Sequence, residues 1–222
     1  MSKGVFITAT GTDVGKTYVS ALLIRSMVRM GNSCGYYKAA ASGAVGFAES
    51  DAGFVKRFTG IKQAEESMLS YRYETPVSPH LAAQWEGRSL CLDQVSADYA
   101  AVGRDYPYVV VEGAGGIVCP LRWDSDQQIL QEELVKALLL PALVVTGAGV
   151  GSINASVLTI HYLKNKGIPI KGIVLNRYSG TAVEEDNRNM IETLTGVTIL
   201  TCVKEQDSIL DLSKACLEQC FA

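Results

Sequence analysis

Residues 8–17, "TATGTDVGKT", give the first indication of how this chain folds. They overlap a β-branched run at residues 5–10 that predicts a buried strand, and they precede a helix predicted over residues 18–30. A strand, a glycine-containing loop and a helix in this order are the context of a phosphate-binding loop. The ending Gly15-Lys16-Thr17 is typical of such loops, whereas Thr10 stands where the common form has its first glycine.

The loop is expected to bind phosphate mainly through its backbone. Gly11 and Gly15 permit backbone angles that other residues resist. The amides of residues 12–17 can then point at one anion, with support from the N-terminus of the following helix. Lys16 would neutralise the outer phosphates, and Thr17 would offer its hydroxyl to Mg²⁺.

A simpler interpretation of the same stretch is a helix capped by Thr12 or Asp13, with Lys16 in solvent. The preceding strand favours the phosphate-binding interpretation. The predicted nucleotide-binding residues here are Gly11, Thr12, Asp13, Val14, Gly15, Lys16, Thr17 and Tyr18.

The rest of the chain repeats the alternation of strand and helix. Strands are predicted over residues 35–39, 108–112, 142–146, 171–176 and 197–203, and helices over residues 92–102, 129–139, 152–164, 183–194 and 208–220. This order predicts an α/β fold of the P-loop NTPase type, a single domain over residues 1–222 with a mostly parallel sheet and helices on both faces. Ligands bind such sheets at the carboxyl ends of the strands.

Composition excludes several classes of partner and location. The net charge of −3 and the absence of a dense basic run argue against nucleic acid as a partner. The start lacks the apolar core of a signal peptide, and the most apolar stretch, residues 137–150, is too short and interrupted to cross a membrane. Six scattered cysteines without a Cys-x-x-Cys pair are expected to be buried thiols in a reducing cytoplasm rather than a zinc site.

Acidic and basic side chains follow the predicted strands. Glu112 ends the strand at residues 108–112 and precedes the glycine-rich residues 113–116, so it is a candidate metal carboxylate as well as a simple strand end. Lys38 lies at the end of the second predicted strand and should share the crevice with Lys16, which suggests a reaction that develops extra negative charge. Asp51 is a candidate second carboxylate, although alone it fits a helix cap or a surface acid equally well.

Seven stretches in this order resemble the dethiobiotin synthetase family, from residue 5 to about residue 201. They are "TATGTDVGKT" at 8–17, "YYKAAASG" at 36–43, "ESDA" at 49–52, "PVSPHLAA" at 76–83, "VVVEGAGG" at 109–116, "GVGSIN" at 149–154 and "GIVLN" at 172–176. The resemblance implies an ATP- and Mg²⁺-dependent cyclo-ligase of biotin biosynthesis that acts on 7,8-diaminononanoate and CO₂. One amine would form a carbamate, the γ-phosphate would move to its oxygen, and the second amine would close a cyclic urea and release phosphate.

The resemblance also implies catalytic and metal-binding roles. Lys16 and Lys38 would supply positive charge at the transferring phosphate, while Thr12 and Ser42 would hydrogen-bond the carbamate or that phosphate. The implied Mg²⁺ ligands are Thr17, Asp51 and Glu112.

Nucleotide and substrate contacts follow from the same resemblance. Asn176 would read the adenine edge, and Gly115 and Glu112 would lie against the nucleotide. The family forms a homodimer in which the substrate tail reaches the partner subunit, and His80 is interpreted as structural because it lies in a Pro-rich loop. The substrate carboxylate would bind free amides at a helix start in the partner, at Gly151, Ser152, Ile153 and Asn154.

The chain departs from the family pattern at four places. Ala9 replaces a usual glycine, Ala39 a usual proline and Gly149 a common basic residue, and residues 201–204 read "TCVK" where relatives frame the base with a Gly-x-Ile-Pro segment. None of these changes removes a charged group from the implied chemistry, but the last leaves the preference for the nucleotide base open.

Three other classes of protein are alternatives to the dethiobiotin synthetase family. A partitioning or septum-placement ATPase switch of the MinD/ParA type would carry a lysine among residues 8–10, and its membrane-binding forms would end in a basic amphipathic helix; neither feature is present. An amidoligase of the cobyrinate type would need a glutaminase domain, for which one α/β domain of 222 residues leaves no room. A binding module without catalysis is disfavoured because Lys16, Lys38, Thr17 and Glu112 are all present.

Overall fold

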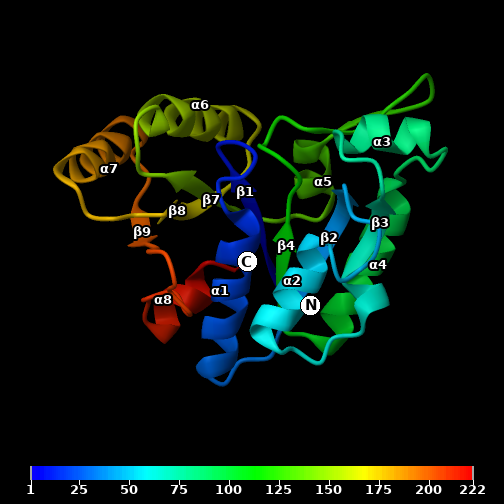
Figure 1. Cartoon of the computed structure of the whole chain (residues 1–222), viewed down its shortest axis with the longest axis horizontal. Coiled ribbons are helices and arrows are strands. Elements are labelled where there is room, and N and C mark those ends of the chain that lie inside the picture. Colours follow the sequence, from blue (N-terminus) through cyan, green and yellow to red (C-terminus); the bar gives the residue numbers. More distant parts are fainter. Residues whose placement is uncertain (1, 222) are drawn as a thin grey trace.

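A computed structural model describes residues 2–221 and shows a seven-stranded parallel sheet (Figure 1). Its strands are β1 (Lys3–Ala9), β2 (Cys34–Ser42), β3 (Leu69–Tyr73), β4 (Tyr108–Glu112), β7 (Ala142–Gly147), β8 (Ile170–Asn176) and β9 (Ile199–Cys202). They lie in the order β3-β2-β4-β1-β7-β8-β9, and every pair in this sheet is parallel. The predicted α/β fold with a mostly parallel sheet is therefore confirmed.

Helices cover both faces of the sheet and enclose two separate hydrophobic clusters. One cluster receives side chains from α1 (Lys16–Arg29), α2 (Asp51–Thr59) and α8 (Lys214–Gln219). The other receives side chains from α3 (Pro79–Trp85), α4 (Leu92–Asp105), α5 (Gln131–Ala137), α6 (Ser152–Asn165) and α7 (Ala182–Thr195). The chain also contains a 3₁₀ turn at Glu65–Ser67 and an antiparallel ribbon of β5 (Pro120–Trp123) and β6 (Gln128–Leu130).

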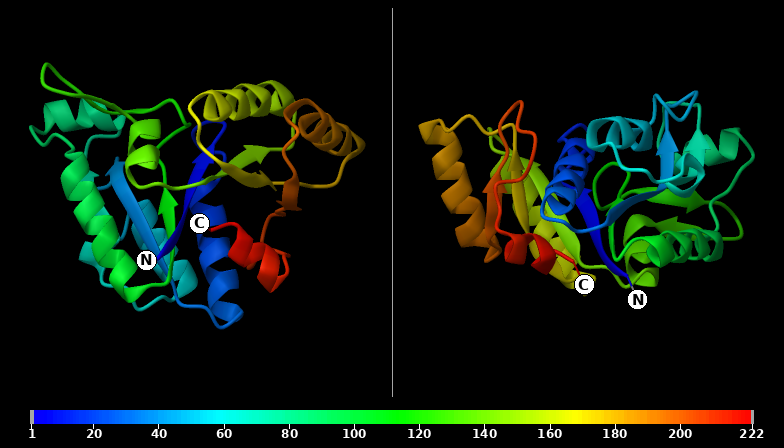
Figure 2. Two further views of the ribbon diagram at one scale, coloured as in Figure 1. Left: turned by 180° about the vertical axis from the view of Figure 1, so that it is seen from behind. Right: turned by 90° about the horizontal axis from the view of Figure 1, so that it is seen from below.

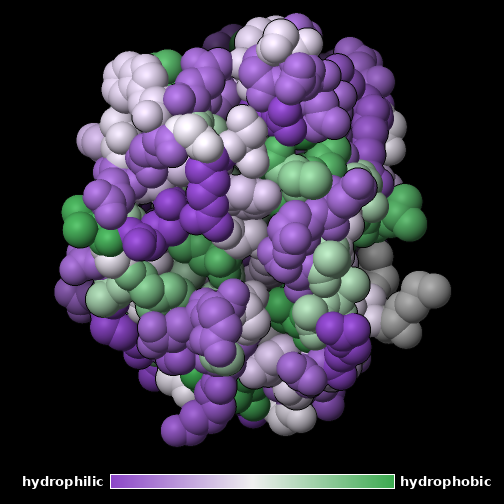
Figure 3. All heavy atoms as spheres, turned by 90° about the vertical axis from the view of Figure 1, so that its right-hand side faces the viewer, coloured by the Kyte–Doolittle hydropathy of each residue, from purple (hydrophilic) through white to green (hydrophobic). Residues whose placement is uncertain are grey.

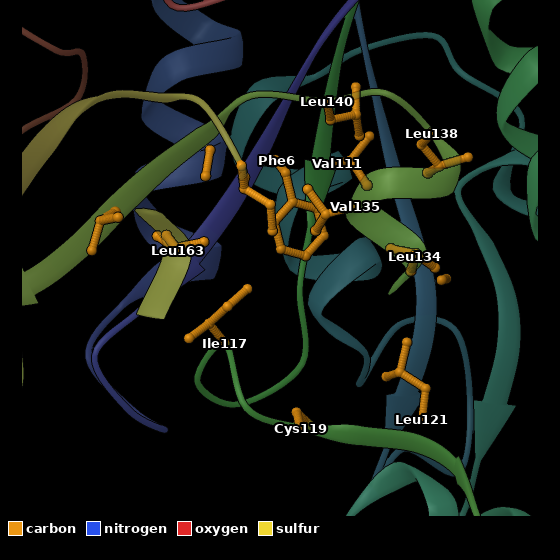
Figure 4. Close-up of a cluster of buried hydrophobic side chains, with 14 of the residues drawn as sticks. Phe6, Val111, Ile117, Cys119, Leu121, Leu134, Val135, Leu138, Leu140 and Leu163 are labelled. Carbon is orange, nitrogen blue, oxygen red and sulfur yellow. The ribbon is translucent and has the colours of Figure 1, made fainter. Parts of the chain in front are cut away.

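Strand β1 shows how the sequence pattern produces these two layers. Because successive side chains of a strand point to opposite faces, Val5 and Ile7 enter the cluster under α1, whereas Phe6 enters the opposite one. Phe6 is fully buried and lies close to Val111 and Val135 (Figure 4). A strand buried on both faces reads as a continuous apolar run, as the sequence of β1 does. Replacing Phe6 by alanine should cost about 3–5 kcal/mol, the usual cost for such a side chain in a core.

Two predicted helices differ from the structure. The helix predicted over residues 208–220 is confined to α8, because Ser213 caps it by accepting a hydrogen bond from the Cys216 amide at 3.3 Å. Upstream of that cap, the Leu210 amide donates to Ser26 Oγ at 2.8 Å, which fixes the chain against α1. The helix predicted over residues 129–139 begins only at α5, because Ile129 pairs with Arg122 in the β5–β6 ribbon.

No helix or strand was predicted from the sequence between residues 40 and 91, where the structure has α2, β3 and α3. His80 therefore lies in the first turn of α3 and not in a loop, because Pro79 occupies the first helical position, where its missing amide hydrogen costs nothing. Its ring nitrogen Nδ1 lies 3.0 Å from Ser78 Oγ, just before the helix.

The predicted burial of the cysteines is confirmed for three of the six. Cys34, Cys119 and Cys220 are buried, and burial raises the pKa of Cys119 to about 11 and that of Cys220 to about 12. Cys91 is exposed because it stands at the start of α4, and Cys202 and Cys216 are partly exposed. All six are free thiols.

The C-terminal segment returns to the amino end of the sheet, near the N-terminus (Figure 2). There the Phe221 ring packs edge-on against Tyr108, with ring centroids 5.1 Å apart. The face turned to the viewer in Figure 3 is mostly hydrophilic, with hydrophobic side chains scattered among polar ones. No helix within residues 2–221 has the length and apolar character needed to cross a membrane.

Candidate active site

The loop between β1 and α1 has the backbone shape of an anion-binding loop. Asp13 has φ 58° and Gly15 has φ 101°, so the chain enters the left-handed region twice before α1 begins. At Gly15 a side chain would also collide, because an added Cβ would lie 2.0 Å from Asn176 Nδ2. Lys16 is buried, and its Nζ donates to the Gly11 carbonyl at 3.3 Å. Burial, and then the charge of Lys38, lowers the Lys16 pKa.

The three side chains predicted to bind a metal meet at the carboxyl end of the sheet. The Thr17 hydroxyl lies 3.0 Å from Asp51 Oδ1 and 2.8 Å from Glu112 Oε1. These residues come from the starts of α1 and α2 and from the end of β4. The structure therefore brings the three predicted metal ligands into direct contact, although they lie far apart in the sequence. Oxygen donors of this kind suit a small hard cation such as Mg²⁺.

Lys38 joins both carboxylates of this cluster. Its Nζ lies 2.6 Å from Asp51 Oδ2 and 2.7 Å from Glu112 Oε1, and it donates to the Gly113 carbonyl at 3.3 Å. Burial alone would lower the Lys38 pKa, but the two carboxylates outweigh it and raise that pKa above 10.5. Burial alone would raise the Asp51 pKa, but Lys38 outweighs it and holds that pKa below 3.8. Lys38 is thus a charged group held in place within an ion-pair network.

A cleft of about 700 Å³ opens above this cluster. Thr12, Asp13, Ser42 and Gly115, all predicted site residues, line it together with the Thr17–Lys38–Asp51–Glu112 cluster. Several other lining residues were not predicted from the sequence, namely Glu49, Phe54, Arg57 and Arg177. Arg177 could have been considered because it directly follows Asn176 beyond the end of β8.

Tyr36 is a further residue that the sequence analysis did not assign. Its hydroxyl donates to Glu112 Oε2 at 3.0 Å, and the side chain is fully buried. Burial, and then the charge of Glu112, raises the Tyr36 pKa, so the phenol stays protonated. Tyr36 and Lys38 are two residues apart on β2 and therefore share a face, a signal that strand periodicity does contain.

Of two further predicted nucleotide-binding residues, Asn176 lies beside the loop and does not line the cleft, whereas Tyr18 does. Asn176 is buried, and its Nδ2 donates to the Val14 carbonyl at 2.8 Å, which ties the end of β8 to the loop. Tyr18 lines the cleft, and its hydroxyl donates to the Asp207 carbonyl.

The predicted carboxylate-binding segment lies apart from this cleft. Gly151 has φ 89° and precedes α6, where Ser152 is buried, Ile153 is partly buried and Asn154 is exposed. Ser152 Oγ has no hydrogen-bond partner among residues 2–221. None of the four residues lines the cleft.

A sequence profile described as an AAA domain matches residues 3–211. The fold is shared with MinD in the MinC:MinD complex of Aquifex aeolicus, with a TM-score of 0.57, 14% identity, and coverage of 92% of this chain and 82% of that one. A ParA family ATPase from Chlorobium tepidum gives a TM-score of 0.55 and 14% identity over 92% of this chain and 84% of that one. At this identity the two structures show only that the chain has the fold of P-loop ATPases.

Similarity in sequence is much higher to proteins named ATP-dependent dethiobiotin synthetase BioD. That of Brachyspira hyodysenteriae is 43% identical over 222 residues, which is all of both chains. That of Clostridium botulinum strain Loch Maree is 40% identical over 214 residues, or 94% of each chain. The chain therefore belongs to the ATP-dependent dethiobiotin synthetase family.

Proposed function

We propose that this protein uses ATP to convert 7,8-diaminononanoate and CO₂ into dethiobiotin, with release of ADP and phosphate. The observation that carries this proposal is the contact among Thr17, Lys38, Asp51 and Glu112 at the base of a cleft bordered by the phosphate-binding loop. We assign 7,8-diaminononanoate, CO₂ and ATP as its substrates because the chain belongs to the dethiobiotin synthetase family.

ATP would bind with its phosphates against the amides of residues 12–17. The left-handed turns at Asp13 and Gly15 and the start of α1 support this placement. Lys16 would neutralise the outer phosphates, and Gly115 would let the backbone approach the nucleotide. Asn176 would read the base through its side-chain oxygen Oδ1, because its Nδ2 already donates a hydrogen bond to the Val14 carbonyl.

The oxygen cluster would hold Mg²⁺. Thr17, Asp51 and Glu112 fit this ion, because the Thr17 hydroxyl lies within 3.0 Å of an oxygen of each carboxylate and all three are hard oxygen ligands. When bound, Mg²⁺ would supply positive charge to the phosphates of ATP during phosphoryl transfer.

The chemistry would proceed in three steps in the cleft. A neutral amine of the substrate attacks CO₂, and the resulting carbamate loses a proton. A carbamate oxygen then attacks the γ-phosphorus, the bond to ADP breaks, and a carbamoyl phosphate forms. The second amine attacks the carbamoyl carbon, phosphate leaves, and the cyclic urea closes with loss of a proton. Lys16 and Lys38 would stabilise the charge in the second step, with Thr12 and Ser42 as hydrogen-bonding groups.

The substrate carboxylate would be bound by a second copy of the chain. Residues 151–154 open α6, where the Ser152 amide donates to the Gly149 carbonyl at 3.1 Å. The amides of Ile153 and Asn154 and the buried Ser152 hydroxyl lack a partner within residues 2–221 and would bind the carboxylate. Exposed apolar side chains at Val150 and Leu158 support an interface near this helix. A homodimer and a cytoplasmic location, the latter consistent with free thiols, belong to this proposal.

A product assay tests the proposal directly. Purified protein would be incubated with 7,8-diaminononanoate, ATP, Mg²⁺ and labelled bicarbonate, and acid-stable label and phosphate would be followed together. We expect label in dethiobiotin that depends on the diamine and matches phosphate one for one. If the rate of phosphate release is the same with and without the diamine and no acid-stable label forms, the protein is instead an ATPase switch.

A further inference from the structure

Tyr36 is held rigidly beside the oxygen cluster. Its backbone amide donates to Gln63 Oε1 at 2.8 Å, and its carbonyl accepts from Gln63 Nε2 at 2.8 Å. Pairing between β2 and β3 starts only at Lys38, so the buried Gln63 side chain replaces a strand partner at this point. The Tyr36 side chain is fully buried, and its hydroxyl can therefore direct a hydrogen bond with little freedom.

The two oxygens of Glu112 have different surroundings. Oε1 accepts from the Thr17 hydroxyl at 2.8 Å and from Lys38 Nζ at 2.7 Å. Oε2 accepts from the Tyr36 hydroxyl at 3.0 Å, its partner within residues 2–221. The terminal torsion of a glutamate is broad, so this hydrogen bond to Oε2, together with the two bonds to Oε1, fixes the plane of the carboxylate. Oε1 is presented to the oxygen cluster, and Oε2 is kept away from it.

We infer that Tyr36 is a positioning residue that makes Glu112 a one-oxygen ligand and thereby favours Mg²⁺ over larger cations. This inference rests on the proposed function, since it assumes that Thr17, Asp51 and Glu112 bind a metal. Mg²⁺ requires near-octahedral geometry with one oxygen from each carboxylate, whereas Ca²⁺ accepts both oxygens of one carboxylate in a looser shell. A Glu112 carboxylate oriented by Tyr36 can bind Mg²⁺ through Oε1 alone. It cannot readily turn to give both oxygens to Ca²⁺. Groups that orient metal ligands typically change metal affinity by about 10–100-fold when removed.

The variant Y36F removes the hydroxyl and keeps the ring, and the next residue provides a matched control. Tyr37 is also fully buried on β2 but points to the opposite face, where its hydroxyl lies 2.6 Å from Ser70 Oγ and 3.2 Å from the Val95 carbonyl. Y37F therefore loses two hydrogen bonds, against one in Y36F, without touching Glu112. A difference between the two variants reports on the oxygen cluster and not on the strand.

The test measures metal binding without turnover. Free Mn²⁺ would be followed by electron paramagnetic resonance with the full chain and a non-hydrolysable ATP analogue, and Mg²⁺ and Ca²⁺ would then compete for the site. We expect Y36F to bind Mg²⁺ about 10-fold more weakly than wild type and to lose most of its preference for Mg²⁺ over Ca²⁺. Y37F should match wild type in both constants.

Two results would overturn the inference and are distinguishable from failure of the proposed function. In the first, the wild type binds Mn²⁺ but Y36F has the same Mg²⁺ affinity and the same preference for Mg²⁺ over Ca²⁺ as the wild type. This result would support the metal site but show that Tyr36 does not affect it. An equal loss in Y37F would assign the effect to the strand. A wild type that binds no Mn²⁺ would overturn both proposals. If Y36F does not fold, Q63M removes the two hydrogen bonds that hold the Tyr36 backbone, and an unchanged cation preference in Q63M refutes the inference.

Discussion

Replacing Lys38 by methionine should destabilise the protein because it leaves a buried carboxylate without its counter-charge. The Lys38 side chain is 3% exposed, that of Glu112 is 0% exposed, and Nζ lies 2.7 Å from Oε1. At an effective dielectric constant of about 20, this distance corresponds to an attraction of about 6 kcal/mol. Desolvation offsets part of that attraction in the native protein, and loss of one partner from a buried pair costs about 3–5 kcal/mol. Asp51 is 43% exposed, so its pair with Lys38 adds little.

Thermal unfolding with Mg²⁺ and nucleotide omitted measures this effect. For a chain of this size, 3–5 kcal/mol corresponds to a decrease in Tm of roughly 6–20 °C. Lys214 provides a control, because its side chain is 54% exposed and its contact with Glu218 is long at 3.9 Å. The Tm of K214M should stay within about 1–2 °C of wild type, as is usual for surface substitutions.

The Tm difference between wild type and K38M should depend on pH in a defined direction. Lys38 holds the Asp51 pKa below 3.8, so this contribution to stability is present above about pH 4 and is lost as the pH falls through the folded pKa. The Lys38 pKa is raised above 10.5, so its own contribution is present below that pH and is lost in strong alkali. The difference should therefore be constant from about pH 5 to 9 and should narrow in acid. A K38M protein with wild-type Tm at pH 7, or a difference that widens in acid, would refute this reasoning.

Three further outcomes are expected. Lys16→Gln should lower turnover by at least ~10²-fold, as expected when a preorganised transition-state charge is removed; turnover within a few-fold of wild type would exclude Lys16 from the mechanism. Asn176→Ala should erase discrimination between ATP and GTP in competition binding, and unchanged discrimination would assign base reading to the backbone near Val203. Gly15→Ala should weaken ATP binding measured by calorimetry at least ~10-fold, because its Cβ would lie 2.0 Å from Asn176 Nδ2 and displace the anion-binding loop. Gly31→Ala is the control for Gly15→Ala, since Gly31 also has positive φ (85°) but nothing within 4 Å of the added Cβ; an equal loss of ATP binding there would contradict the collision argument.

The ribbon, the helices of residues 51–85 and the final helix show where local pattern was insufficient. The start of α8 is set by the Ser213 cap and by a hydrogen bond from Leu210 to Ser26, a residue 184 positions earlier. Ile129 fits an apolar helical pattern equally well, but pairing with Arg122 makes it part of a strand. Short segments with ambiguous periodicity take the structure that their distant partners impose.

The sequence by itself determined most of the alternation of strands and helices outside residues 40–91, and the glycine loop between β1 and α1. These features are local, because a β-branched run, a glycine loop and an apolar helical repeat each specify the backbone of adjacent residues. The position of Glu112 at the end of β4 was also predictable, since parallel strands present their carboxyl ends at one edge. Lys38 was wrongly predicted to end its strand, because β2 continues to Ser42 by pairing with β3.

Only the tertiary structure decided which of these residues touch. Pairing of β2 with β4 places Lys38 opposite Glu112 across 74 positions of sequence, and a cap at Ser50 aims Asp51 at the same point. The hydrogen bond from Tyr36 to Glu112 depends on the same register. Strand order and register come from burying the two faces of the whole sheet, so no stretch of sequence contains them alone.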